Sequence, residues 1–294
     1  MRFLKFLGSN ARYIIWFLVY FSIAWLIIGD IFGYSLFYFF VLLAIYGVSI
    51  SIALSPFGEL ILRSTENCRE PSTVQEQNYL LPMFEEVYQD ALEAEPKLNK
   101  GIKIYIMDAM YANAFAIGRQ TVAVTRGAME ILSADELKGV IAHELGHINY
   151  GHTKAMLLSL IGNFFFSVIV WTLRLILSIF QFISEVVAQF NIVGFVLSIF
   201  TSIFQIVVNV SVLVFINLSE VILSSNSRSN ELQADTFAYE IGYGEELASA
   251  LYIFQKMSMN NKMTLSERMK ASHPHIARRI ENLEQLNQSG GLLQ

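Results

Sequence analysis

The residues best suited to chemistry in this chain are His143, Glu144 and His147, which form the pattern H-E-x-x-H. On a helix, two residues four apart differ by about 40° in direction, so both imidazole rings leave one face and can bind one metal ion. Glu144 lies one step round the helix from the first histidine and can accept a proton from a water molecule at the metal. The pattern therefore predicts hydrolysis assisted by a metal ion, with zinc as the expected ion.

A zinc site of this kind needs a third protein ligand and leaves one position for water. The later histidines and carboxylates that could supply it are His152, Glu220, Glu231, Asp235, His273 and His275. Glu231 and Asp235 are favoured because they also lie four apart, so one carboxylate can bind the ion while the other orients a histidine ligand. His152 follows His147 by five residues, about 140° round a helix, which favours a place on the protein surface.

The elements that position these residues follow from the hydrophobic pattern. Ser133 and Glu136 form a capping box, and an apolar stripe with helical spacing comes after it, so the H-E-x-x-H residues are expected on a helix. A second helix is expected over residues 73–94. Residues 103–107 and 121–125 alternate in hydrophobicity like short strands. This part of the chain is therefore expected to mix helices with a small sheet.

The composition indicates a membrane protein. With 54% hydrophobic and only 15% charged residues, the chain falls below the roughly 25% charge of an ordinary soluble domain. Residues 13–29 and 31–56 carry no charged side chain, and each approaches the ~20 residues that cross a bilayer as a helix. They predict a transmembrane hairpin over residues 1–56. A cleaved signal peptide is the rival interpretation, but the first apolar run is too long and no small-residue cleavage site follows it.

A second apolar region covers residues 155–223 and is interrupted only by Arg174, Glu185 and Glu220. If a helix enters the membrane at residue 155, Arg174 lies about 30 Å along it, at the far interface. Polar residues beyond Arg174 then favour a helix on the outer surface, and the chain returns through residues 192–223. The region predicts a second transmembrane pair with an outer connection.

Basic residues predict the orientation of these spans. Basic residues are concentrated in the segments that flank the four expected spans on one side of the membrane. They are Arg2, Lys5, Arg12, Arg63, Arg69, Lys154 and Arg228. An excess of Lys and Arg marks the cytoplasmic side, so both termini and the polar regions 57–154 and 224–294 are expected in the cytoplasm. There, His147 would stand about 10 Å and Glu231 about 12 Å above the membrane, so their helices would meet at one height.

The remaining composition narrows the compartment and the partners. The single cysteine, Cys68, cannot form an intramolecular disulfide, which fits a reducing compartment. The net charge of −5 and the lack of a basic patch give no reason to expect a nucleic acid. The lipid bilayer is the expected surrounding, and the oligomeric state is left open.

Four segments together give the chain a family resemblance. They are HELGH at His143, NELQAD with Glu231 and Asp235, NAFAIG beginning at Asn113, and SHPHIARRI with His273 and Arg279. This set resembles the HtpX family of bacterial membrane metalloproteases, which is related to the CAAX prenyl endopeptidases. The likeness extends over essentially the whole chain, from the two N-terminal spans to the polar C-terminal end.

The resemblance implies four groups of site residues. These are the zinc ligands His143, His147 and Glu231, the catalytic residues Glu144, His273 and Arg279, the carboxylate Asp235 behind the ligands, and the substrate-aligning residues Asn113 and Ala114. Glu144 would be the base, and His273 and Arg279 would lie near the developing oxyanion. Two positions depart from the family pattern, because His152 stands where relatives often carry an acid and His275 where a second proline is common.

The sequence predicts an α-rich (α+β) multi-pass membrane protein with four transmembrane helices and a small β element. The resemblance implies a cytoplasmic zincin-type domain, similar to gluzincins, that holds one zinc ion per chain in a bacterial cell membrane. It also implies cleavage of membrane or misfolded proteins on the cytoplasmic side, in protein quality control or a stress response.

Three alternatives remain open. A CAAX-type or other processing endopeptidase shares the ligands, although that branch usually carries more than four spans. A site-2-type intramembrane protease buries its H-E-x-x-H within a span, whereas Lys138, Asn149 and Lys154 surround it here and no Asp-Gly partner motif follows. A catalytically silent membrane scaffold could keep zinc for structure, although Glu144 would then have no task.

Overall fold

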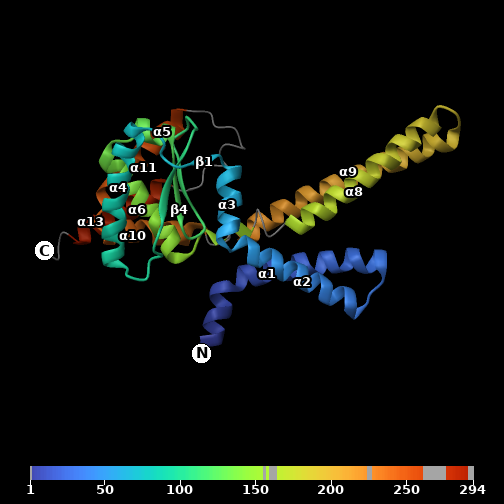
Figure 1. Cartoon of the computed structure of the whole chain (residues 1–294), viewed down its shortest axis with the longest axis horizontal. Coiled ribbons are helices and arrows are strands. Elements are labelled where there is room, and N and C mark those ends of the chain that lie inside the picture. Colours follow the sequence, from blue (N-terminus) through green and yellow to red (C-terminus); the bar gives the residue numbers. More distant parts are fainter. Residues whose placement is uncertain (1, 155–156, 159–163, 224–226, 261–275, 291–294) are drawn as a thin grey trace. The chain divides into compact units, whose positions relative to one another are not determined.

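The computed structural model describes residues 2–154, 157–158, 164–223, 227–260 and 276–290. The chain divides into two compact units, whose elements are labelled in Figure 1. The apolar unit joins Met1–Ala53 to Leu158–Ser225, and the sheet unit joins Leu54–Leu157 to Asn226–Gln294. Each unit is therefore built from two separate stretches of sequence.

Four long apolar helices make up the described part of the apolar unit. They are α1 (Arg2–Phe32), α2 (Leu36–Ala53), α8 (Phe164–Ala188) and α9 (Ile192–Leu223). Each contains a stretch that is long and apolar enough to cross a membrane, so the four expected spans are confirmed by length and composition. Where α1 meets α2, Trp16 and Tyr20 are buried, and the Tyr46 hydroxyl donates to the Tyr20 carbonyl at 3.3 Å.

The helix α8 differs from the expectation in one respect. Within residues 164–223, no separate surface helix follows Arg174, because α8 continues and its apolar stretch Val170–Ala188 includes that residue. The polar side chains that suggested a surface helix bond to one another instead. Gln181 donates to Glu185 at 2.6 Å, and the Thr201 hydroxyl of α9 donates to Gln181. Polar groups satisfied in this way are tolerated on packed membrane helices, so their spacing did not require a helix on the surface.

The sheet unit contains four described strands. They are β1 (Cys68–Arg69), β2 (Lys103–Met107), β3 (Ala114–Ile117) and β4 (Thr121–Thr125), in the spatial order β1-β2-β4-β3. The central strands β2 and β4 are parallel, with Lys103 opposite Thr121, and each outer strand is antiparallel to its neighbour. β2 and β4 have the bounds expected from their alternating pattern, whereas β1 has too few residues to show one.

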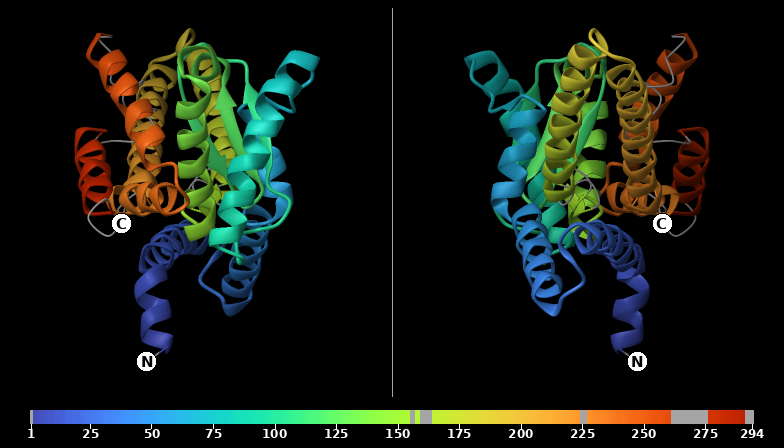
Figure 2. Two further views of the ribbon diagram at one scale, coloured as in Figure 1. Left: turned by 90° about the vertical axis from the view of Figure 1, so that its left-hand side faces the viewer. Right: turned by 90° about the vertical axis from the view of Figure 1, so that its right-hand side faces the viewer.

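Helices make up the rest of the described sheet unit, and Figure 2 shows them beside the sheet from two opposite directions. They are α3 (Pro56–Thr65), α4 (Val74–Ala94), α5 (Arg126–Ile131), α6 (Ala134–Tyr150), α10 (Ser227–Glu240), α11 (Gly244–Asn260) and α13 (Ile276–Gly290). Capping boxes begin α4 and α6, in which Thr73 pairs with Glu76 and Ser133 pairs with Glu136. The expected α-rich fold with a small sheet is confirmed.

The helix α6 carries the H-E-x-x-H residues through the core of the sheet unit. It packs against α4, α10, α11 and strand β3. Its residues Leu137, Ile141 and Leu145 are fully buried, in one cluster with Val87 of α4 and Ile104 of β2. Because such a core is densely packed, the side chains of α6 are held in fixed positions.

Candidate metal centre

His143, His147 and Glu231 meet inside the sheet unit. The histidines lie on α6 and the glutamate on α10, all three are buried, and their ligand atoms lie within 4.8 Å of one another. The Nε2 atoms of His143 and His147 are 3.1 Å apart. Oxygens of the Glu231 carboxylate lie 3.6 Å and 3.4 Å, respectively, from these two nitrogens. Both rings and the carboxylate therefore face one point.

This donor set suits a metal ion. Two imidazole nitrogens and one carboxylate oxygen are the three protein ligands typical of a hydrolytic zinc site, which keeps a further position for water. Among the residues that the structure describes, this is the one group of three such side chains close enough to share an ion. Of the candidates for a third ligand, Glu231 is the one that joins the histidines.

A pair of small residues lets the two ligand helices approach each other. A Cβ atom added to Gly146 of α6 would lie 3.0 Å from the Cα atom of Ala234 on α10. Carbon atoms pack best at about 3.5–4.0 Å, so glycine fits this crossing better than any larger residue. The glycine within HELGH thus brings the histidines within reach of Glu231.

Asp235 orients the first histidine of the pattern. Its Oδ1 atom lies 2.9 Å from Nδ1 of His143, so His143 donates through Nδ1 and keeps the lone pair of Nε2 for the metal. Burial opposes ionisation of Asp235, but the hydrogen bond from His143 and the charge of Arg279 lower its pKa to about 2. Asp235 is therefore an anion behind the ligands, in the place that the resemblance implies.

Arg279 is a buried cation that joins the carboxylates of the site. Its guanidinium donates to Asp235 at 2.7 Å and 2.9 Å and lies 3.1 Å from Glu231. Burial alone would lower the pKa of this arginine, but the carboxylates of Asp235, Glu231 and Glu144 raise it above its ordinary value. Glu144 is itself buried, next to His143 on α6. The predicted base and the arginine thus belong to one enclosed group.

The other predicted site residues lie at the sheet edge or outside the described part. Ala114 begins β3 and Asn113 precedes it, on the outer strand that packs against α6. His273 and His275 lie outside the described residues, and the side chain of Glu220 is not among those described. Eight of the nine predicted site residues therefore lie on α6, α10 and α13 or at the start of β3, and the ninth, His273, lies outside the described residues.

His152 is not one of the three converging ligands, as expected, but it contacts one of them. Its Nδ1 atom is 2.9 Å from Nδ1 of His147, and its Nε2 atom is 3.1 Å from Oε1 of Gln233 on α10. A surface position was expected on the assumption that the helix continues, whereas α6 ends at Tyr150 and Gly151 is left-handed, with a φ of 69°. The chain turns back there, which brings His152 to His147. Glycine commonly ends helices in this way, so Gly151 was the signal for this contact, but no pattern pointed to Gln233.

We expect His152 to strengthen metal binding through His147. When Nε2 of His147 faces the ion, its Nδ1 carries the hydrogen, which His152 accepts, and His152 in turn donates to Gln233. Losing such a partner lowers metal affinity by about 10–100-fold, so His152→Ala should yield zinc to a chromophoric chelator correspondingly more easily. His152→Asp can accept the same hydrogen and should recover part of the affinity. Equal affinities of the wild type and His152→Ala would contradict this role.

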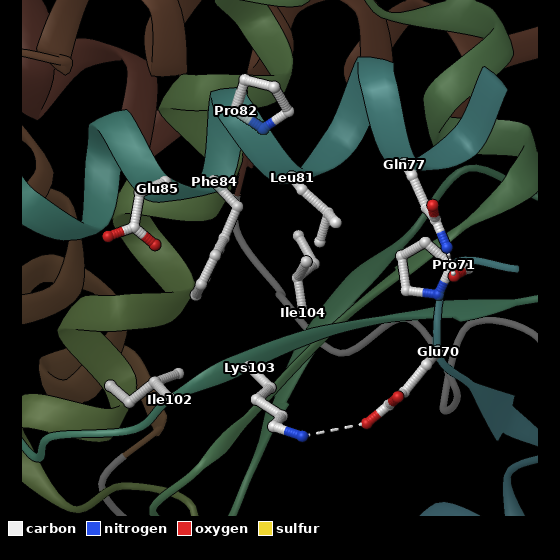
Figure 3. Close-up of a pocket in the computed structure, with 10 residues that line it drawn as sticks. All are labelled: Glu70, Pro71, Gln77, Leu81, Pro82, Phe84, Glu85, Ile102, Lys103 and Ile104. Carbon is white, nitrogen blue, oxygen red and sulfur yellow. Dashed lines mark hydrogen bonds and ion pairs between the residues drawn. The ribbon is translucent and has the colours of Figure 1, made fainter. Parts of the chain in front are cut away.

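A cavity of about 590 Å³ lies elsewhere in the sheet unit, between α4 and β2. Figure 3 shows Leu81 and Phe84 of α4 opposite Ile104 of β2, with the Lys103–Glu70 ion pair among the lining residues. None of the converging ligands lines this cavity. It therefore takes no part in the metal chemistry.

Comparison with known proteins agrees with this geometry. Residues 75–287 match the family described as Peptidase family M48. The match covers more than half of the chain and includes His143, His147 and Glu231.

Relatives named Protease HtpX homolog are similar to parts of the chain. The one from Aquifex aeolicus is 42% identical over 96 residues, which are 31% of this chain and 30% of the relative. The one from Helicobacter acinonychis is 34% identical over 124 residues, or 40% and 38%. The one from Thermodesulfovibrio yellowstonii is 56% identical over 52 residues, or 16% and 18%. Each match spans less than two fifths of the relative's length.

These similarities support the HtpX resemblance that HELGH and NELQAD suggested. The ligand pattern, the buried meeting of its side chains and the match over residues 75–287 agree, and the chain belongs to Peptidase family M48.

Proposed function

We propose that this chain is a zinc-dependent membrane endopeptidase of the HtpX type. The observation that carries the proposal is the buried convergence of His143, His147 and Glu231, with Glu144 next to the first ligand on α6. The peptidase family and the four apolar helices support it. A site that held zinc only for structure would need no carboxylate at position 144.

The side chains of the site divide the work of peptide hydrolysis. A zinc ion at such a site lowers the pKa of a water molecule and polarises the scissile carbonyl. His143 and His147 turn their Nε2 lone pairs toward one point, and Asp235 fixes the tautomer of His143. Glu144 accepts the proton of the attacking water and passes it to the leaving amine.

Arg279 is proposed to stabilise the oxyanion that forms on the scissile carbonyl. A preorganised positive charge is effective there because the site excludes water. The contact of Arg279 with Glu231 and the influence of Glu144 on its pKa support a place beside the reacting groups. His273 is proposed as a second partner of the oxyanion from the resemblance alone.

The strand β3, with Asn113 and Ala114, is proposed to align the substrate backbone. The Asn113 carbonyl accepts from the Thr125 amide at 3.0 Å. Residues of an antiparallel ladder alternate in direction, so the backbone groups of Ala114 and Ala116 point away from β4 and can pair with a further strand. Ala114 is only 3% exposed, so this edge must open before a substrate strand can reach it.

Membrane and misfolded proteins are the proposed substrates, and quality control or a stress response in a bacterial cell membrane is the proposed setting. The relatives' name, Protease HtpX homolog, supports a protease and specifies no substrate. The apolar helices support substrates in or near the membrane, because they would hold the enzyme there. The one-sided distribution of Lys and Arg supports a cytoplasmic site.

Removal of the metal should abolish proteolysis reversibly. The purified full chain in detergent, incubated with 1,10-phenanthroline and dialysed, should no longer cleave casein, because nothing then polarises the scissile carbonyl. One equivalent of zinc should restore cleavage. Persistent cleavage by a preparation that elemental analysis shows to be metal-free would exclude the proposed mechanism.

The proposed orientation predicts that the turn between α8 and α9 lies outside the cytoplasm. In a Cys68→Ser background, Phe190→Cys, which lies between the two helices and is 80% exposed, should react with a membrane-impermeant maleimide on intact cells. Val74→Cys, at a residue that is 72% exposed, should react only after the cells are permeabilised. Protection of position 190 in both conditions would show that the second apolar region forms a re-entrant hairpin and not a transmembrane pair, and would leave the metal centre unaffected.

A further inference from the structure

The short helix α3 leads from the second apolar helix into the sheet unit. Helix α2 ends at Ala53 and α3 begins at Pro56, where Ser55 caps it by accepting from the Phe57 amide at 3.2 Å. Three Cα–Cα steps join Ala53 to Pro56 and span at most about 11 Å, so the first turn of α3 lies close to the end of α2 along the chain. Helix α3 must therefore lie near the end of the span that α2 is expected to form.

One face of α3 is firmly attached to the sheet. Glu59 is buried, and its carboxylate accepts from the backbone amides of Arg119 and Gln120, at 2.5 Å and 3.2 Å, in the turn between β3 and β4. Arg63 lies over the ring of Tyr105 on β2, with 4.7 Å between its Cζ atom and the ring centroid, and donates to its hydroxyl. Both charged residues of α3 are thus engaged with the sheet unit.

The opposite face of α3, here called the outer face, is apolar and uncharged. It comprises Phe57, Leu60, Ile61 and Ser64, which fall within about 100° of arc on a helix. Phe57 is 58% exposed, Leu60 48% and Ile61 37%. Exposure of large apolar side chains to water is unfavourable, and no charged residue interrupts this group. We therefore expect the outer face to contact a partner.

We propose that the outer face of α3 lies in the headgroup region of the lipid bilayer, as an interfacial helix continuous with α2. A second copy of the chain is a poor occupant, because three partly exposed side chains offer roughly 300 Å² whereas a stable dimer buries about 800 Å² per partner. Lipid needs no such area, since the adjoining span already holds the chain in the membrane. The sheet, anchored to α3 through Glu59 and Arg63, is thereby held at the membrane surface. This proposal rests on the membrane spans and not on the proposed proteolysis.

Spin labels on the full chain in phosphatidylcholine–phosphatidylglycerol nanodiscs test this placement. In a Cys68→Ser background, labels at Phe57→Cys and, separately, Leu60→Cys should be relaxed several-fold more by oxygen, which concentrates in lipid, than by a water-soluble nickel chelate. A label at the control Val74→Cys should be relaxed more by the nickel chelate than by oxygen. Val74 is 72% exposed and lies at the start of α4, which follows α3 in the chain and is not part of the outer face. Two labelled positions guard against misfolding of either variant, and stoichiometric zinc binding shows that each is folded.

Two outcomes would overturn the proposal. Nickel accessibility at positions 57 and 60 equal to that at position 74 would place the outer face in water. Labels at both positions that are immobilised and protected from oxygen and nickel alike would show that protein covers the face, and loss of this protection on dilution of the protein among excess nanodiscs would identify a second copy.

Discussion

Glu144→Gln should lower proteolysis by about 10²–10⁴-fold while the metal stays bound, because the amide fills the same space and cannot accept the proton of the attacking water. Glu231→Ala should lose the metal as well as the activity, because it removes one of three buried ligands. Elemental analysis of the two purified variants, combined with cleavage of casein, separates the two roles. The result that distinguishes the two roles is the metal content, because both variants lose activity but only Glu231→Ala should lose the metal.

Matched substitutions on the same helices serve as controls. Asp135→Asn on α6 and Glu240→Ala on α10 each remove an exposed carboxylate outside the converging ligand group, so both should retain metal and activity. Near-stoichiometric zinc in Glu231→Ala would refute the ligand assignment and direct attention to His273, which lies outside the described residues. Equal proteolysis by the wild type and Glu144→Gln would refute the base, and a folded, zinc-loaded wild type with no activity on any unfolded substrate would favour the silent scaffold.

Arg279→Ala should reduce turnover on the order of a hundredfold or more, the scale found when a charge partner of an oxyanion is removed. It should also lower stability by about 3–5 kcal/mol, because Asp235 would be left as a buried anion without its guanidinium partner. Zinc should remain bound, since Glu231 is released from the arginine and not removed. Turnover, thermal unfolding in detergent and metal content measure the three effects.

The neighbouring residue offers a close control. Arg278 is exposed on the same turn of α13, and Arg278→Ala should leave turnover and unfolding unchanged. Arg279→Lys keeps the charge but cannot donate to Asp235 and Glu231 through a planar fork, so it should recover only part of the lost stability. If Arg279→Ala unfolds more easily yet turns over substrate normally, the arginine is structural and the oxyanion assignment fails.

The elements with local signals were predictable from the sequence. Helices α4 and α6 begin where expected, α6 at the predicted capping box of Ser133 and Glu136, and the alternating residues of β2 and β4 form strands with the expected bounds. The pairing of the H-E-x-x-H helix with Glu231 was predictable from spacing. His143 and His147 lie four residues apart, as do Glu231 and Asp235, so each pair shares one face of its helix.

Features that depend on chain reversal or on contacts between helices were not predictable in this way. The contact of His152 with His147 arises because the helix ends at Gly151, whereas the helical-face argument holds only while a helix continues. The hydrogen bond between Thr201 and Gln181 shows the same limit for α8, since hydropathy along one helix cannot reveal a polar partner on the next. Local sequence patterns therefore predict helices and strands, whereas the contacts of polar side chains depend on how these helices and strands pack.

The order of the site residues along the chain has a consequence for synthesis. Because α8 and α9 lie between His147 and Glu231, a ribosome must complete the whole second apolar hairpin before the third ligand exists. Arg279 is translated later still. A nascent chain therefore cannot bring His143, His147 and Glu231 together until the whole of that hairpin has been made.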